Sequence, residues 1–190
     1  MGKLYTEIDD KLREFILAQQ LFFVATAPLE EDGHLNLSPK GLAGIRVLAP
    51  TRVAYLDYVG SGVETIAHLN QNGRIVLMFC AFEGPPKIVR LHGRGRVVEA
   101  PDPGFGQIAE NWDSAMSARA IIIVDVERIS DSCGYGVPLY GFKGERDQLL
   151  KWAERKGPEA VRNYQVEKNA ASIDGLPGLH WVQGESRRKT

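Results

Sequence analysis

The chain has 190 residues, of which 44% are hydrophobic and 25% are charged, and its formal net charge at pH 7 is −1. This length suits one well-buried core. The near-zero charge excludes the overall positive field that nucleic-acid binders usually carry, so we expect no nucleic-acid partner.

Two further features concern the compartment. The longest apolar runs, 75–82 and 120–124, are far shorter than the roughly 20 residues that cross a bilayer, and the acidic first ten residues contain no apolar signal segment. Cys80 and Cys133 show no spacing typical of a metal or redox site. We therefore expect a cytoplasmic protein with reduced thiols, no membrane partner and no metal, in which Cys80 is buried.

The first third of the chain predicts a helix followed by strands. Apolar spacing over 7–20 indicates an amphipathic helix with Thr6 as its N-cap. Residues 21–27 and 34–38 flank a turn at 31–33 and predict a β-hairpin. More strand is expected at 47–50 and 52–57.

A second helix is expected over 63–72. It begins at Ser61-Gly62-Val63-Glu64, which has the pattern of a capping box in which Ser61 and Glu64 bond each other's backbone N–H groups. It ends at Asn72-Gly73, where glycine suits the left-handed conformation that terminates helices.

The rest of the chain continues with strands and then changes character. Residues 74–82 predict a central strand, and 87–99 alternate around Gly93 and Gly95, which indicate a bulge or a close backbone approach. The remaining expected elements are a helix at 107–118, a strand at 119–129, helices at 145–156 and 158–168, and a loop-like end at 169–182.

Five or six strands with few helices predict a mainly β fold, a small antiparallel barrel with peripheral α-helices. We expect residues 1–130 to form the barrel. Residues 131–190 are expected to form a C-terminal arm of helices and loops that packs on the barrel or on a dimer partner.

The first candidate site is Ser38-Pro39-Lys40-Gly41, at the end of the second strand. A lysine beside a hydroxyl and a glycine N–H provides the charge and the donors that a phosphate binds. The alternative is an ordinary strand-ending turn with a solvated lysine.

The second candidate is the loop from Tyr58 to Gly62, which opens the second helix. Backbone N–H groups at a helix N-terminus bind anions, although this spacing is neither a P-loop nor a dinucleotide-binding fingerprint. Glu64 places a negative charge in the first turn, where it competes with an anion. The alternative is a plain capped helix.

Two other segments stand out. Arg90 shares one strand face with His92, Arg94 and Arg96, which indicates either a ligand-binding face or an exposed edge strand. The glycine-rich segment 132–138, together with Asn169 and 172–179, is either functional or a packed irregular arm. We recognise no Ser/His/Asp catalytic set, so a hydrolase is not expected.

Taken together, these segments resemble the pyridoxamine 5′-phosphate oxidase-like FMN-binding split barrels over nearly the whole chain. The resemblance rests on Ser38-Pro39-Lys40-Gly41, on the helix region 60–73, on the strands 74–82 and 88–98, and on the two C-terminal motifs. Those motifs, Cys-Gly-Tyr-Gly-Val-Pro from Cys133 and Ser-Ile-Asp-Gly-Leu-Pro-Gly-Leu from Ser172, resemble an uncharacterised subgroup.

The resemblance implies a homodimer with FMN in a groove between the subunits. The FMN phosphate would be held by Lys40, by the helix start at 61–65 and by Arg90, and the arm would complete the pocket with Trp181 or Tyr135 as stacking groups. The residues assigned to the cofactor in this way are Ser38, Lys40, Gly41, Tyr58, Ser61, Gly62, Glu64, Thr65, Arg90 and Trp181.

The sequence departs from the true oxidases at two places. They carry basic residues at the start of the second helix, where this chain has Glu64 and Thr65, and their C-terminal tryptophan-and-arginine substrate motif is not recognisable here. We therefore expect an FMN-dependent oxidoreductase whose substrate is not pyridoxamine phosphate.

Two alternatives remain open. One is a flavin carrier or sensor without catalysis. The other is the same barrel with the deazaflavin F420 or with haem, although none of the four histidines is favoured as an axial ligand.

Overall fold

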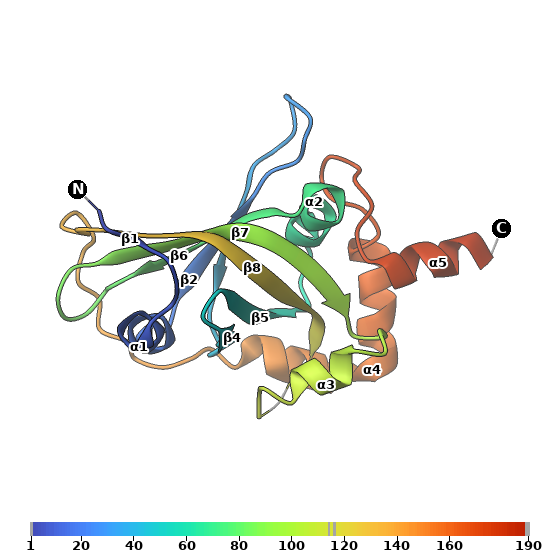
Figure 1. Ribbon diagram of the computed structural model, residues 1–190. Coiled ribbons are helices and arrows are strands. Elements are labelled where there is room, and N and C mark those ends of the chain that lie inside the picture. The colour runs from blue at the N-terminus through green and yellow to red at the C-terminus, as the bar shows by residue number, and fades with distance from the viewer. Residues whose placement is uncertain (1, 114, 116, 189–190) are drawn as a thin grey trace.

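The computed structural model describes residues 2–113, 115 and 117–188. Figure 1 shows a strongly curved sheet with helices around it and the two termini at opposite ends. The elements follow in the order β1 (Leu4–Tyr5), α1 (Asp10–Ala18), β2 (Phe22–Thr26), β3 (Asn36–Lys40), β4 (Ile45–Ala49), β5 (Arg52–Tyr58), α2 (Glu64–Asn72), β6 (Arg74–Cys80), β7 (Ile88–Glu99), α3 (Phe105–Ala109), β8 (Ala118–Ser132), α4 (Gln148–Lys168) and α5 (His180–Arg188).

The strands form one antiparallel sheet in the order β3-β2-β6-β7-β8-β5-β4, and β1 pairs with β8 beside this path. Strands from both ends of the path face one buried core, which contains Phe22 of β2, Val47 of β4 and Leu91 of β7. The sheet must therefore curl on itself. This confirms the expected mainly β fold, an antiparallel split barrel with peripheral helices.

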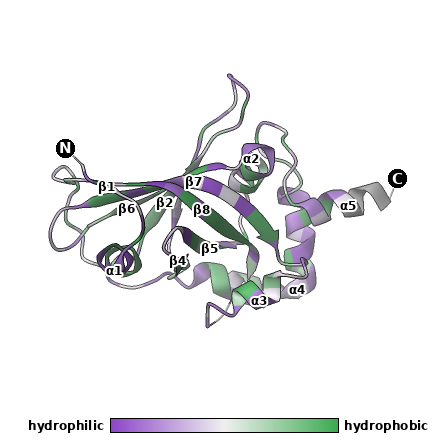
Figure 2. Cartoon of the chain, in the orientation of Figure 1, coloured by the Kyte–Doolittle hydropathy of each residue, from purple (hydrophilic) through white to green (hydrophobic). Residues whose placement is uncertain are grey.

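The hydropathy of the residues differs between the sheet and the peripheral helix α4. Hydrophobic residues run along β2, β6 and β8, whereas hydrophilic residues cover much of α4 (Figure 2). A second, smaller core lies on the other face of β5 and β8, where Leu56 and Ile121 pack with Trp112. Cys80 is buried, as expected. Within the described ranges, no helix is long and apolar enough to cross a membrane.

The two edge strands of the barrel, β3 and β4, are joined by a tight turn over 41–44. Leu42 and Ala43 both adopt positive φ angles, 58° and 48°, and the Gly44 N–H donates to the Gly41 carbonyl over 3.3 Å. Two successive left-handed residues are strained unless they are glycine. The Trp112 indole donates to the Gly44 carbonyl over 2.9 Å and so fixes the turn from outside.

Two expected helix starts were wrong. The first helix begins at Asp10, and its N-cap is Asp9, whose carboxylate accepts the Leu12 N–H over 2.8 Å, rather than Thr6. The second helix has Val63 at its N-cap without a side-chain cap. The capping box of Ser61 and Glu64 is therefore absent from this helix start, although its glycine end is confirmed, since Gly73 has a φ of 71°.

The expected helix over 107–118 was too long: α3 ends at Ala109 and β8 begins at Ala118, and residues 114 and 116 of that range lie outside the described residues. The two expected helices after residue 145 are confirmed as α4, which is broken at Gly157, where φ is 75°, immediately before Pro158. The chain end is only partly loop-like, because α5 begins at His180.

The glycine at the bulge of β7 gives a test of the curvature. The register of β7 against β8 shifts between His92 and Gly93, and a Cβ at Gly93 would clash with the backbone carbonyl oxygen of Asp125. We predict that Gly93→Ala lowers the free energy of unfolding by about 2 kcal/mol or more, measured by urea denaturation.

The matched control is Gly104→Ala, because a Cβ there meets nothing within 4 Å and φ is −85°. This variant should keep its stability. Equal losses in the two variants would contradict the close approach at Gly93.

Candidate functional site

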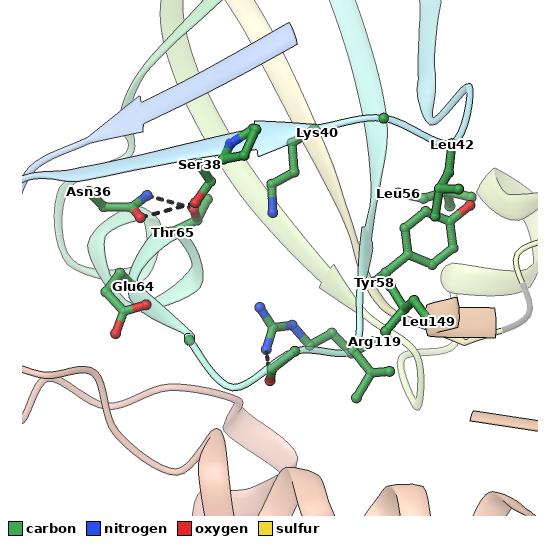
Figure 3. A pocket seen from close by; sticks show the side chains of 15 residues that line it. Asn36, Ser38, Lys40, Leu42, Leu56, Tyr58, Glu64, Thr65, Arg119 and Leu149 are labelled. Carbon is green, nitrogen blue, oxygen red and sulfur yellow. Dashed lines mark hydrogen bonds between the residues drawn. The ribbon is translucent and has the colours of Figure 1, made fainter. Parts of the chain in front are cut away.

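A cavity of about 380 Å³ opens between β3, β5 and the start of α2, a volume typical of small-ligand sites. Figure 3 shows Asn36, Ser38 and Thr65 on one side of it, Leu42, Leu56, Tyr58 and Leu149 on the other, and Lys40 between the two groups. The remaining lining residues are Pro39, Gly41, Val59, Gly60, Gly62, Glu64 and Arg119.

A buried ion-pair cluster lies at the base of this cavity. Asp57 is completely buried, and its Oδ1 lies 2.7 Å from Lys40 Nζ while its Oδ2 lies 2.9 Å from Arg119 Nε. Burial raises the pKa of the Asp57 carboxyl, but the charges and hydrogen bonds of Arg119 and Lys40 outweigh burial and lower it to about 2. This carboxylate therefore links three strands, because Lys40 lies on β3, Asp57 on β5 and Arg119 on β8.

Arg119 is the member of the cluster that the sequence analysis missed. Its side chain is only 5% exposed, and its Nη1 also donates to the Gly60 carbonyl over 3.1 Å. The available signal was a single arginine at the head of the apolar run 120–124. An arginine is seldom buried without a partner. A buried arginine at this position therefore predicts that a carboxylate from another part of the chain lies beside it.

A hydrogen-bonded polar network forms the wall around Asn36. The Asn36 amide donates to Thr65 Oγ1 over 2.9 Å and to Thr26 Oγ1 over 3.1 Å, and its carbonyl accepts from Ser38 Oγ over 3.1 Å. Thr26 in turn bonds Nδ1 of the buried His68 over 2.9 Å. Because Thr65 Oγ1 accepts from the Asn36 amide, its hydroxyl would bind a ligand as a donor.

The start of α2 adds backbone donors. With no side-chain cap, the N–H groups of the first turn are open to an anion. Glu64 does line the cavity, but its Oε1 accepts the backbone N–H of Ile173 over 3.3 Å. Glu64 therefore bonds the C-terminal arm through one oxygen, while its negative charge, which we expect to compete with an anion, still lines the cavity.

The opposite side of the cavity is apolar. Leu42 and Leu56 come from the barrel edge, Tyr58 from the end of β5 and Leu149 from α4. Burial raises the pKa of the Tyr58 hydroxyl, which therefore stays protonated at neutral pH. The cavity as a whole joins a cationic, hydroxyl-rich end to an apolar end.

The structure brings most of the expected site residues together. Those that line the cavity are Ser38, Lys40, Gly41, Tyr58, Gly62, Glu64 and Thr65. Ser61 belongs to the same loop but does not line the cavity. Trp181 lies on α5, where the Arg162 guanidinium stacks on its ring at 4.2 Å from the centroid. Tyr135 is 82% exposed.

Arg90 lies elsewhere, on the outer face of the barrel. Its Nη1 donates to Ser132 Oγ over 3.1 Å, and it borders a shallow groove with Phe23, Leu37 and Met78. The structure therefore does not bring Arg90 to the Lys40 cavity of the same chain.

Comparisons of the sequence with known proteins find similarity to one family. A family model described as pyridoxamine 5′-phosphate oxidase matches residues 8–133. The pyridoxamine 5′-phosphate oxidase family protein ustO of Aspergillus flavus is 42% identical over 199 residues, an alignment that covers 95% of this chain and 79% of that protein.

Solved structures share the fold at lower identity. HupZ of group A Streptococcus has a TM-score of 0.52 at 21% identity, covering 70% of this chain and 99% of its own. A putative pyridoxamine 5′-phosphate oxidase from Lactobacillus delbrueckii has a TM-score of 0.51 at 17% identity, covering 67% of this chain and 98% of its own. These two likenesses concern the fold alone.

The ion-pair cluster predicts a large effect of neutralising Asp57. Asp57→Asn leaves Lys40 and Arg119 without their shared carboxylate, so we expect it to lower the free energy of unfolding at pH 7 by about 3 kcal/mol or more. In the wild type, the lowered pKa of Asp57 contributes stability above pH 4, which is lost as the pH falls toward 2. The difference between the two proteins should therefore shrink over that range in urea titrations.

Asp125→Asn is the matched control. Asp125 lies 2.6 Å from Arg52, but both side chains are about half exposed. An exposed pair of this kind contributes less than about 1 kcal/mol. A loss at Asp57 no greater than the loss at Asp125 would contradict the structural role of the cluster.

Proposed function

The chain belongs to the pyridoxamine 5′-phosphate oxidase family, and from that premise we propose that it binds FMN in the cavity beside Lys40 and works as a flavin-dependent oxidoreductase. The observation that carries this proposal is the two-sided cavity. A cationic, hydroxyl-rich end beside an uncapped helix start suits a phosphate ester, and the apolar end suits an aromatic ring system.

The proposed phosphate end is the one that contains Lys40. Lys40 and Arg119 carry two positive charges and Asp57 carries one negative charge, so this cluster has a net charge of +1, and the carboxylate of Glu64 lines the same cavity outside the cluster. The Thr65 hydroxyl and the first-turn N–H groups of α2 supply neutral donors around it. Ser38 and Gly41 complete this end of the cavity.

The proposed ring end is formed by Leu42, Tyr58 and Leu149. Leu42 is held in place by the strained turn over 41–44, and Leu149 comes from the arm. Contacts of this kind orient a planar ring and exclude water from one of its faces. Bound FMN would supply the hydride or electron chemistry, while the protein supplies position and electrostatics.

The substrate proposed here is a small molecule other than pyridoxamine phosphate. The helix start that faces the cavity presents Gly62 and Glu64 rather than basic side chains. A second phosphate-bearing ligand would find few cations there.

We further propose that residues 1–130 form the flavin-binding barrel and that 131–190 form the arm that completes its pocket, in a cytoplasmic setting. The roles assigned to Arg90 and Trp181 stay predictions from the resemblance.

Haem is less well supported than a flavin. Among the described residues that line the cavity there is no histidine, cysteine or methionine, and Tyr58 is the one side chain of a type that ligates haem iron. An absorption spectrum of the purified protein separates flavin bands from a Soret band.

A flavin carrier or sensor is the second candidate. It is favoured by Glu64, which lines the cavity where the true oxidases carry positive charge. Reduction of the bound flavin by NAD(P)H would support the oxidoreductase. Bound flavin that no nicotinamide donor reduces would support the carrier.

The homodimer is proposed on the outer face of the barrel. Phe23, Leu37 and Met78 line a groove there, and Leu37 is 67% exposed, as is expected of an apolar face that another subunit covers. The face lies on β3, β2 and β6, so a second subunit there would approach the strand that carries Lys40.

The flavin proposal predicts a specific effect at Thr65. Thr65→Val keeps the volume of the side chain but removes the hydroxyl, so we expect FMN affinity to fall about tenfold, measured by quenching of flavin fluorescence. Thr51→Val, in the exposed turn between β4 and β5, is the control and should bind as the wild type does. Wild-type protein that neither carries nor binds FMN would refute the proposal.

The dimer proposal predicts that Leu37→Glu yields a monomer in light scattering coupled to size-exclusion chromatography, because it places a charge in the apolar contact. Leu17→Glu, on the exposed side of α1, is the control and should leave the mass of the dimer unchanged. A wild type with monomer mass at micromolar concentration would exclude this dimer.

A further inference from the structure

The loop 59–62 forms part of one wall of the cavity, and its first residue is anchored by the barrel, because Val59 is buried and its N–H donates to the Ser117 carbonyl over 3.0 Å. It joins β5 to α2 and contains Gly60 and Gly62. Around Gly60 there is open space, since the nearest atom to a Cβ there would lie 4.0 Å away. Glycine-containing loops lose much backbone entropy on ordering, so a fixed conformation here needs bonds from outside the loop.

Those bonds come from Asn169 in the C-terminal arm. Asn169 is completely buried, and its Nδ2 donates to the Gly60 carbonyl over 2.9 Å and to the Ser61 carbonyl over 3.4 Å. Arg119 donates to the same Gly60 carbonyl. In a planar trans peptide, N–H and C=O point in opposite directions. Holding the carbonyls of Gly60 and Ser61 therefore orients the N–H groups of the residues that follow them.

The arm presents Asn169 on a rigid loop. The Leu179 N–H donates to the Asn169 carbonyl over 3.0 Å, and the Gly178 N–H donates to the Ala170 carbonyl over 2.9 Å. A Cβ at Gly178 would clash with the Asn169 carbonyl oxygen, so the two chain segments approach closely only because residue 178 is glycine. Leu179 is completely buried in the main core.

The tip of this loop is tied to the barrel beside the cavity. The Ile173 N–H donates to Glu64 in the first turn of α2. Asp174 accepts both the backbone N–H of His34, over 2.9 Å, and a hydrogen bond with His34 Nδ1, over 2.6 Å. These contacts bring the arm to the start of α2 and to the connection between β2 and β3, close to both sides of the polar end of the cavity.

If Asn169 served only to pack in the core, its polar amide would lower the stability of the protein. Within the described part of the chain, its Oδ1 is buried and has no hydrogen-bond partner. A buried amide oxygen without a partner is destabilising, so an apolar residue would serve the core better. What the amide provides, and a leucine would not, is the pair of hydrogen bonds to the loop.

From these contacts we infer that Asn169 is a positioning residue, which fixes the loop 59–62 in the form that presents the N–H groups of Ser61 and Gly62 to an anion. The inference rests on the proposed function and assigns a role to the Ser-Ile-Asp-Gly-Leu-Pro-Gly-Leu segment, which holds Asn169 against the loop. The arm thereby takes part in the cavity without contributing a charged ligand of its own.

The experiment compares Asn169→Ala and Asn169→Leu with the wild type. The leucine variant fills a similar volume but has no donor, so it decides the question if the alanine variant does not fold. We expect amide hydrogen exchange over 60–65 in the FMN-free protein to accelerate about tenfold or more and FMN affinity to fall about tenfold. Thermal unfolding provides the measure of global stability.

Ser172→Ala is the matched control. The Ser172 hydroxyl accepts the Leu176 N–H over 3.1 Å, so this change loosens the same loop without removing the Asn169 donor. It should lower the melting temperature but change exchange over 60–65 and FMN affinity much less than the Asn169 variants do. The inference is overturned if exchange over 60–65 is unaffected at Asn169, or if Ser172→Ala accelerates it equally. Failure of the wild type to bind FMN would refute the proposed function. The exchange data would still test whether Asn169 fixes the loop 59–62.

Discussion

The buried carboxylate of Asp57 is the group on which the rest of this structure depends. A charge without access to water must be matched by opposite charges at hydrogen-bond distance, and Lys40 and Arg119 provide them at 2.7 and 2.9 Å. Because these partners belong to β3 and β8, the carboxylate connects the edge of the sheet to its centre. The cation that faces the cavity is consequently fixed in place before any ligand arrives, which is the arrangement that binds an anion with least reorganisation.

Strand alternation decides which face each candidate residue occupies. Lys40 pairs in register with Phe22, whose side chain enters the core, whereas Pro39 pairs with Phe23 on the outside. Arg90 pairs with Met78 and so shares the outer face. A slip of one residue in either strand would exchange the two faces, and the hydrophobic core prevents this slip.

The cavity is assembled from parts of the chain that are distant in sequence. Its base comes from β5 and β8, its polar wall from β3 and α2, and one apolar side chain, Leu149, from α4. The backbone of its loop is bonded by Asn169 from beyond α4. Glu64, which in the sequence looked like a competitor for an anion, also bonds the arm and helps to hold this assembly together.

The sequence alone determined the elements with strong periodicity and the family. The barrel strands, the glycine end of α2, the break between the last two helical segments and most of the cavity residues could be predicted, because hydrophobic alternation and glycine conformation are local properties. Helix starts at Asp9 and Val63 could not, since several nearby polar residues compete for a cap and packing chooses among them.

Lys40 and the start of α2 could be singled out from the sequence as candidate groups for an anion, because a charge and a helix N-terminus can be recognised locally. Only the tertiary structure decided that Lys40 shares a buried carboxylate with Arg119, that Arg90 and Trp181 do not line the cavity of their own chain, and that Asn169 bonds the loop. The physical reason is that these relations depend on strand register and on closure of the sheet, which bring together residues far apart in the chain.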